Sequence, residues 1–229
     1  MIAIKTMWKD ETEIAANAFH DVIRIGGYAT VWKLDRIVPS SCEGIVSLGL
    51  CAGLTPDVSI GQIMCASMVM TDRDTHEADK EWRGRISDRT KFNEVQPWYS
   101  SWDPGAANGI SNKAALFRKS GAWCFDHDTV LVAEFAKLRK IPFVVFRAVS
   151  TNWIDDVPNS LDFFNLMGLG IQVNAGAFDY ASLAAAVFKT GEWAVLESTL
   201  MTQYQTALAA LRKAVALVDA NFCWKGQRT

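Results

Sequence analysis

The order of apolar and polar positions along the chain predicts alternating strands and helices. The clearest buried strand is 141–150 (IPFVVFRAVS), and 44–50 has the same apolar character. Apolar residues at helical spacing mark helices at 10–19 and 129–138. The complete set of predicted strands is 2–4, 21–25, 44–50, 62–70, 122–125 and 141–150. Further helices are predicted over 28–38 and from 161 onward, ending in a long amphipathic helix around 208–218.

Strands that alternate with helices predict an α/β fold of three layers, α/β/α, with a mixed, mostly parallel central sheet. No repeat, linker or low-complexity tract divides the chain, so we expect a single domain over 1–229. A small-residue turn is predicted at 51–56, and the polar stretch 71–109 is predicted to be loop-like. Ligands of such sheets bind at the carboxyl ends of strands. The residues to inspect are therefore 26–27, 50–53, 126–128 and 150–156.

Composition narrows the class of function. Half of the 229 residues are hydrophobic, which provides for a sizeable core, and the net charge of −2 gives no reason to expect nucleic acid or an anionic membrane as partner. The N-terminus lacks the long apolar region of a signal peptide, and the longest apolar stretch, around 183–188, is too short to span a bilayer. Five scattered cysteines form no CxxC pair, and there are three histidines. We expect a cytoplasmic protein with no metal site and no cofactor.

Two blocks of sequence carry a resemblance to a known superfamily. The first, over 44–64, is GIVSLGLCAGLTPDVSIGQIM, and the second, over 124–151, is CFDHDTVLVAEFAKLRKIPFVVFRAVST. They resemble the strand, "GxAGGL" turn and "xxGDIV" strand, and the "V(E/D)MExxAVAxxxxxxxxPFxxxRxISD" segment, of the superfamily of purine nucleoside phosphorylases and methylthioadenosine/S-adenosylhomocysteine nucleosidases. The resemblance implies a nucleoside phosphorylase-like fold, cleavage of the N-glycosidic bond of a purine nucleoside, and a homo-oligomer.

Within that superfamily the chain is most similar to the short nucleosidases of hopanoid gene clusters, which remove adenine from adenosylhopane. The N-terminal part is short, with a glycine pair directly after residue 25, and Leu50 stands where longer relatives carry Ser or Thr. Segment 79–82 and the Ala- and Leu-rich C-terminal helices are also similar to that branch. The resemblance implies a hydrolase that acts on a 5′-modified adenosine.

The sugar site implied by the resemblance centres on three consecutive residues. Cleavage of an N-glycosidic bond develops positive charge on the ribose, which the site must stabilise while it orients the sugar. The acid that accepts hydrogen bonds from the ribose hydroxyls corresponds to Asp128, with His127 in place of the family's Met and Asp126 in place of the preceding acid. Without the resemblance, Asp126 and Asp128 are typical caps of the helix that follows. His127 is either a sugar contact or a packed side chain.

Other site residues are implied nearer the N-terminus. Glu11 corresponds to the acid that activates the attacking water, although Glu13 competes for that role and either residue suits the first turn of a helix. Gly27 and the Cys51, Ala52, Gly53 turn would let the backbone approach the ligand closely. Cys51 is expected to be a small filler, because no partner that would activate its thiol is evident.

The chain departs from the family pattern after the strand 141–150. The family's "SD" supplies the Asp that protonates the purine at N7, whereas this chain has Ser150 and Thr151. The hydroxyl of Thr151 could donate a hydrogen bond in place of that acid, although it is a poor general acid at neutral pH. The amide of Asn152 could hold N7 by a hydrogen bond, and Asp155 and Asp156 could fold back toward the base. The alternative is a catalytically impaired homologue that still binds nucleosides.

Phosphorolysis is the remaining enzymatic alternative, with phosphate as the nucleophile in place of water. Arg147 corresponds to a family arginine that often takes part in binding phosphate, but it could equally be a structural cation of the strand. Leu50 and the short N-terminus remove other expected phosphate contacts. Three tryptophans could stack on the base or simply cover the core: Trp98, Trp102 and Trp123.

Overall fold

The structure is a computed structural model, and it describes residues 1–7, 9–19, 21–27, 29–90, 95–101, 104–107, 109–155 and 202–218. The strands are β1 (Ile2–Lys5), β2 (Val22–Ile25), β3 (Gly44–Gly53), β4 (Ile63–Met70), β5 (Thr75–Glu77), β6 (Val95–Ser100), β7 (Cys124–Asp126) and β8 (Phe143–Thr151). The helices are α1 (Lys9–Ala18), α2 (Val31–Ile37), α3 (Lys80–Thr90), α4 (Gly109–Ser120), α5 (Thr129–Arg139) and α9 (Tyr204–Leu217), with a 3-10 turn, η1, at Pro104–Ala107.

The sheet is mixed, and part of it closes on itself. Its order is β2-β1-β3-β7-β6-β4-β5, and β8 pairs with both β3 and β4. The strands β3, β7, β6, β4 and β8 therefore form a ring. The pairs β1–β2, β1–β3, β3–β8, β4–β6 and β6–β7 are parallel, and the other pairs are antiparallel. The expectation of a mixed, mostly parallel sheet is confirmed, while the closure is an addition to it.

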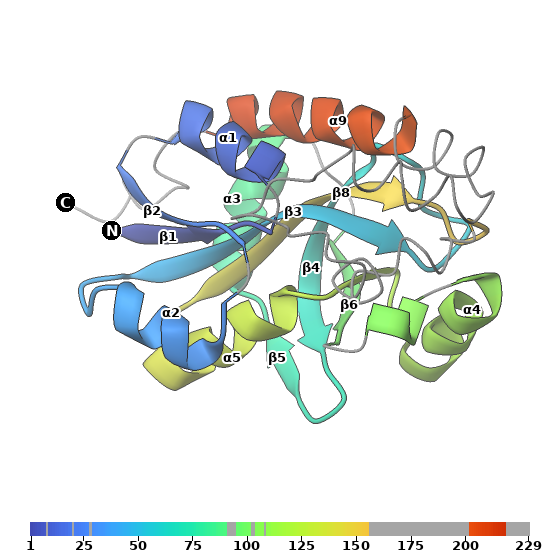
Figure 1. The fold of residues 1–229 in the computed structure, drawn as a ribbon, viewed down its shortest axis with the longest axis horizontal. Helices are drawn as coiled ribbons and strands as arrows, with labels where there is room; N and C mark the ends of the chain where they lie inside the picture. Colours follow the sequence, from blue (N-terminus) through green and yellow to red (C-terminus); the bar gives the residue numbers. More distant parts are fainter. Residues whose placement is uncertain are drawn as a thin grey trace, which may run out of the picture.

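Helices cover both faces of the sheet, as Figure 1 shows: α1 and α9 lie on one face, and α2 and α5 on the other. Strand side chains alternate between these faces. In β8, Val144 and Phe146 pack in the core beneath α1, α3 and α9, whereas Val145 packs in the core beneath α2 and α5. The two helical layers and the sheet between them are the three layers that the sequence predicts.

Most predicted elements are present with shifted ends. The strands predicted at 2–4, 21–25, 62–70, 122–125 and 141–150 correspond to β1, β2, β4, β7 and β8, and the helices at 10–19 and 129–138 correspond to α1 and α5. The helix predicted over 28–38 begins only at Val31, because Thr30 caps it by accepting a hydrogen bond from the backbone N–H of Lys33. The helix α9 confirms the long C-terminal helix.

Two predictions of irregular structure are wrong. Cys51, Ala52 and Gly53 are not a turn but the end of β3, because Ala52 and Gly53 pair with β7. The stretch predicted as loop, 71–109, contains β5, α3, β6 and η1. Its pattern is weak for physical reasons. Only Trp82 and Ile86 are buried among the described side chains of α3, and β6 contains Pro97, a residue that sequence patterns associate with the absence of a strand.

Some predictions lie outside the described residues. These are the helices expected between 161 and 201, the apolar stretch 183–188, and the side chains of Trp102, Asp156 and Cys223. Within the part of the chain that the structure describes, no helix has the length and apolar character that crossing a membrane requires.

Candidate functional site

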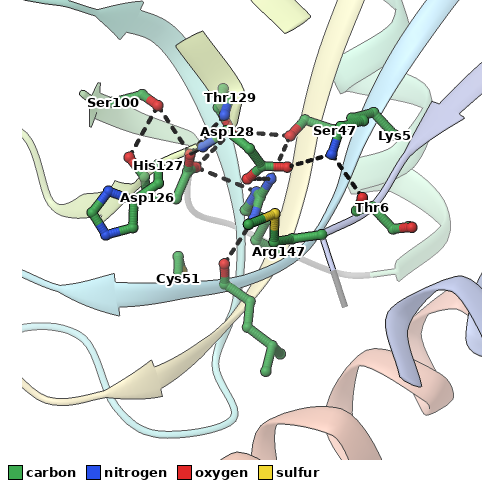
Figure 2. Close-up of polar contacts among 12 residues, drawn as sticks. Lys5, Thr6, Ser47, Cys51, Ser100, Asp126, His127, Asp128, Thr129 and Arg147 are labelled. Carbon is green, nitrogen blue, oxygen red and sulfur yellow. Dashed lines mark hydrogen bonds and ion pairs between the residues drawn. The ribbon is translucent and has the colours of Figure 1, made fainter. Parts of the chain in front are cut away.

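Four buried charged residues meet near the ends of β1 and β7. Lys5 is the last residue of β1, Asp126 is the last of β7, and Arg147 lies in β8 opposite Gly49 of β3. Asp128 lies directly before α5. Figure 2 shows Lys5, Asp126, Asp128 and Arg147 directed toward one another, and we call these four residues the charged network. The pairing of β1, β3 and β8 therefore assembles a polar site from distant parts of the sequence.

Asp126 has the geometry of a helix cap. Its Oδ1 accepts hydrogen bonds from the backbone N–H of Asp128 at 3.0 Å and of Thr129 at 2.7 Å. Its Oδ2 accepts hydrogen bonds from Trp98 Nε1 at 2.6 Å and from Thr129 Oγ1 at 2.5 Å. Ser100 Oγ donates to Oδ1 at 3.0 Å. Both carboxylate oxygens thus serve the start of α5, which is the capping alternative that the sequence leaves open.

Asp128 differs from Asp126, since its side chain makes no capping hydrogen bond. Its Oδ1 accepts a hydrogen bond from Arg147 Nη2 at 2.5 Å, and its Oδ2 accepts one from Lys5 Nζ at 3.3 Å. Burial by itself would raise the pKa of Asp128, but the charges of Arg147 and Lys5 outweigh it and lower the pKa below its usual value. Asp128 is therefore a buried carboxylate that stays ionised at neutral pH.

Arg147 is buried and uses most of its donors on the protein. Nη1 donates to the carbonyl oxygen of Leu50 at 2.8 Å, and Nη2 donates to Ser47 Oγ at 2.7 Å as well as to Asp128. Nε lies 3.3 Å from Asp126 Oδ2, but its direction does not make a hydrogen bond. Burial alone would lower the pKa of the guanidinium, whereas the carboxylates of Asp126 and Asp128 raise it above its ordinary value. These contacts are those of a structural cation.

Glu11 is a buried carboxylate that joins the segment after β1 to the second half of β3. Its Oε2 accepts a hydrogen bond from the backbone N–H of Met7 at 2.8 Å, and its Oε1 accepts one from that of Leu50 at 2.9 Å. A Cβ at Gly49 would lie only 2.5 Å from Glu11 Oε1, so the carboxylate can occupy this position only beside a glycine. Glu13 is exposed instead. The structure therefore brings Glu11, and not Glu13, to the strand ends.

The residues after β8 form a fixed turn. The backbone N–H of Asn152 donates to Asp155 Oδ2 at 2.5 Å, and the backbone N–H of Asp155 donates to the carbonyl oxygen of Asn152 at 3.2 Å. Asp155 is therefore held at the turn by its own carboxylate. Thr151 Oγ1 is buried and has no hydrogen-bond partner among the described residues. The side-chain amide of Asn152 likewise makes no hydrogen bond within the described ranges.

Two of the predicted binding residues have ordinary packing contacts. His127 is half-buried, with Nδ1 lying 3.2 Å from the carbonyl oxygen of Ser101 and its ring meeting the Phe125 ring edge-on at 4.8 Å. Burial and the neighbouring Cys124 thiol raise the pKa of Cys51, so the expectation that Cys51 is a filler agrees with its surroundings.

The predicted glycine positions lie in different places. Gly53 is buried at the end of β3, where a Cβ would lie 2.5 Å from Val58 Cγ2, and Ala52 beside it is half-buried. Gly27 has a φ of 70°, which favours glycine, but it follows β2 at the edge of the sheet. Ile25 pairs with Lys5 of the charged network, so Gly27 lies two residues beyond that pair, on the side of β1 away from β3.

Several site residues are absent from the sequence-based set. Lys5 is completely buried. The sequence feature that could have identified it is a lysine directly after the apolar residues of the predicted strand, in the run IAIK. Ser47 and Thr129 join β3 to α5 through a hydrogen bond of 2.9 Å between their hydroxyls, which no local pattern reveals. Trp98 is fully buried and Trp123 packs against the core. Of the two alternatives for these tryptophans, stacking on a base or covering the core, their positions agree with the second.

A separate groove of about 810 Å³ lies at the other end of α5. Its lining residues come from the start of α2, the turn between β4 and β5, and the last part of α5: Ala29, Thr30, Val31, Trp32, Arg73, Asp74, His76, Glu134, Lys137 and Leu138. Trp32 is 74% exposed there and Leu138 is 50% exposed. Burial lowers the pKa of His76. None of these residues belongs to the charged network.

Comparison by sequence identifies no relative: no protein-family profile matches the chain, and no curated protein matches it. Solved structures do match. A Helicobacter pylori 5′-methylthioadenosine/S-adenosylhomocysteine nucleosidase mutant with 5′-methylthioadenosine in its active site superposes with a TM-score of 0.61 at 12% identity, over 93% of this chain and 97% of that one. Native futalosine hydrolase of the same organism gives 0.62 at 11% identity, over 93% and 96%.

A third similar structure is the nucleosidase of Neisseria meningitidis in complex with methylthio-immucillin-A, with a TM-score of 0.60 at 12% identity, over 94% of this chain and 96% of that one. At identities this low, the structural similarity is informative about the fold alone. The chain therefore has the fold of the methylthioadenosine/S-adenosylhomocysteine nucleosidases.

Proposed function

We propose that the chain is a nucleosidase that hydrolyses the N-glycosidic bond of a purine nucleoside. The observation that carries this proposal is the position of Glu11, a buried carboxylate held by two backbone amides, one after β1 and one in β3. A carboxylate fixed in this way suits a general base that takes a proton from water. The fold supports the proposal, because similar structures include nucleosidases with a nucleoside or an analogue bound.

In the proposed reaction the water oxygen bonds to the anomeric carbon of the sugar while Glu11 takes a proton from that water. The bond between the anomeric carbon and the base nitrogen breaks, and its electron pair leaves with the base. The amide of Asn152 holds the leaving base by a hydrogen bond, and the base then takes a proton from solvent, because an amide does not act as an acid at neutral pH. Asp128 accepts a hydrogen bond from a sugar hydroxyl.

The balance of buried charge suits a sugar that becomes positive. Within the charged network, Lys5 and Arg147 offset Asp126 and Asp128, so these four charges sum to zero. Glu11 adds one negative charge at the same strand ends. A site with excess negative charge stabilises a developing oxocarbenium ion more than the neutral substrate.

Hydrolysis is favoured over phosphorolysis by the contacts of Arg147. Its guanidinium is only 1% exposed and donates to Leu50, Ser47 and Asp128. A phosphate would need an arginine with free donors that can reach it. We therefore propose water as the nucleophile.

For the substrate we propose a 5′-modified adenosine, of which adenosylhopane is one example. The resemblance to the short hopanoid-cluster nucleosidases supports this choice. Among the structures of similar fold, one holds 5′-methylthioadenosine and another holds methylthio-immucillin-A.

The test measures release of adenine from adenosine, 5′-methylthioadenosine and a long-chain 5′-alkyl adenosine, each with and without phosphate. We expect release without phosphate, and a loss of about 10²–10⁴-fold in kcat for Glu11→Gln. Glu13→Gln is the matched control, because Glu13 is exposed two residues away on the same helix, and it should keep the activity.

Three outcomes separate the alternatives. Release that needs phosphate and yields ribose 1-phosphate would show a phosphorylase. Binding of adenine nucleosides without release would show a homologue that has lost catalysis, with Thr151 in the position of the missing acid. Equal activity of Glu11→Gln and Glu13→Gln would contradict the role given to Glu11.

A further inference from the structure

Lys113 of α4 is a buried lysine whose ammonium points at the turn that follows β8. The residue is completely buried. Its Nζ donates to the carbonyl oxygen of Asn152 at 2.5 Å and to that of Asp155 at 2.9 Å. Burying an ammonium has a high cost in free energy, which hydrogen bonds must offset. The carbonyl oxygens of the turn therefore help to offset the cost of burying Lys113, and the same hydrogen bonds attach the turn to α4.

These bonds fix the backbone of Asn152 on both sides. Its carbonyl oxygen accepts hydrogen bonds from Lys113 and from the backbone N–H of Asp155, and its own N–H donates to the Asp155 carboxylate. The side-chain amide is the part of Asn152 that makes no hydrogen bond within the described ranges. Backbone held this firmly gives the amide a defined position beside the end of β8.

We propose that Lys113 is a positioning residue for the base: it holds the turn 152–155 so that the Asn152 amide donates a hydrogen bond to N7 of a bound purine. The inference rests on the proposed function, since it assigns a purine to this site. Lys113 does not touch the ligand and acts only through the turn. Asp155 has the same task from the other side of the peptide.

The decisive measurement is the affinity for two ligands, adenine and 7-deazaadenine, by isothermal titration calorimetry. The two bases differ only in the acceptor at N7. One hydrogen bond to that acceptor corresponds to a preference for adenine of up to about tenfold in Kd. We expect the unmodified protein to show this preference and Lys113→Met to lose it, with adenine weakened and 7-deazaadenine nearly unchanged.

Two further variants make the test robust. Asp155→Ala removes the acceptor of the Asn152 N–H from a half-buried position, so it serves if Lys113→Met fails to fold, and it should lose the preference as well. Lys119→Met is the matched control: Lys119 is an exposed lysine of the same helix, with its ammonium 5.8 Å from the centre of the Tyr99 ring. This control should keep the preference.

Each other outcome has a definite meaning. A parallel loss of affinity for both bases in Lys113→Met would show a merely structural role, and a preference retained in Lys113→Met and Asp155→Ala would overturn the inference. Absence of any preference in the unmodified protein would also overturn it. If the preference is present but no base is released from any nucleoside, the proposed function fails while the role of Lys113 stands.

Discussion

The two ends of α5 hold ion pairs of the same chemical kind in opposite surroundings. Before its first turn, Asp128 lies between Lys5 and Arg147, and all three residues are buried. In its last turn, Lys137 pairs with Asp74 beside the open groove, and both side chains are largely exposed. Charges at the buried end have partners from several strands, whereas those at the exposed end compete with water.

This difference teaches which charges determine the structure of the site. Water cannot solvate a buried carboxylate that loses its cation. Its charge then remains uncompensated, which destabilises the folded state. An exposed pair gains little, because water and salt screen it. The buried end should therefore respond strongly to single substitutions and to pH, and the exposed end should respond weakly.

The largest effect is expected for Arg147→Met. This change leaves both Asp126 and Asp128 without their shared cation in a buried place, and such losses cost about 3–5 kcal/mol in the free energy of unfolding. Urea denaturation measures it, with Arg118→Met, an exposed site, as the control. A loss of unfolding free energy no larger than that of Arg118→Met would contradict the expectation that the buried end of α5 responds strongly to substitution.

A smaller effect is expected for Lys5→Met, because Arg147 still pairs with Asp128, and we expect a loss of about 1–3 kcal/mol. Since the folded-state pKa of Asp128 lies below its usual value, its ionised form stabilises the fold at neutral pH. That contribution disappears as the pH falls through the folded-state pKa. Without Lys5 the pKa rises, so the loss should begin at a higher pH.

Unfolding by urea over a series of pH values below neutrality checks this expectation. The exposed residue Lys80 supplies the control, Lys80→Met, whose profile should follow that of the unmodified protein. Coinciding profiles for Lys5→Met and the control would show that Lys5 does not influence Asp128.

The smallest effect is expected at the exposed end of α5. Lys137→Met removes the partner of Asp74, and because water solvates that carboxylate we expect no measurable change in Tm. Thermal unfolding at low and high salt tests this. A marked loss of stability would mean that this pair is as important as the buried one and would remove the contrast.

The sequence predicts the layers of the fold because they depend on local alternation. Residues 143–149 are buried on both faces, and the apolar run 141–150 predicts this directly. The resemblance of the sequence to a known superfamily also identifies Glu11, Asp128 and Arg147 as candidate site residues. The sequence does not predict the closure of the sheet, because the pairing of β8 with β4 joins segments that share no local signal.

Residues that act through distant backbone are harder to predict. Lys113 lies in a helix with ordinary charged and apolar residues, and its partners are carbonyl oxygens some forty residues away, at Asn152 and Asp155. A carbonyl oxygen is present at every residue, so no sequence pattern marks it as an acceptor. The roles of Ser47 and Thr129 are hidden for another reason: their hydroxyls meet across 82 positions of sequence, and no local pattern links them.

The ring of strands has a consequence for the order in which the molecule can assemble. Because β3 pairs with β8, Arg147 reaches Ser47 and donates a hydrogen bond to its hydroxyl, although these two residues are 100 positions apart in the chain. During synthesis, β3 therefore emerges long before its partner, and the backbone N–H and C=O groups of the edge that pairs with β8 lack their sheet partners until then. Contacts this remote make folding slow, since a long loop must close before they form. β1 pairs with the opposite edge of β3, at residues that also pair with β8, so it cannot take the place of β8 in the nascent chain.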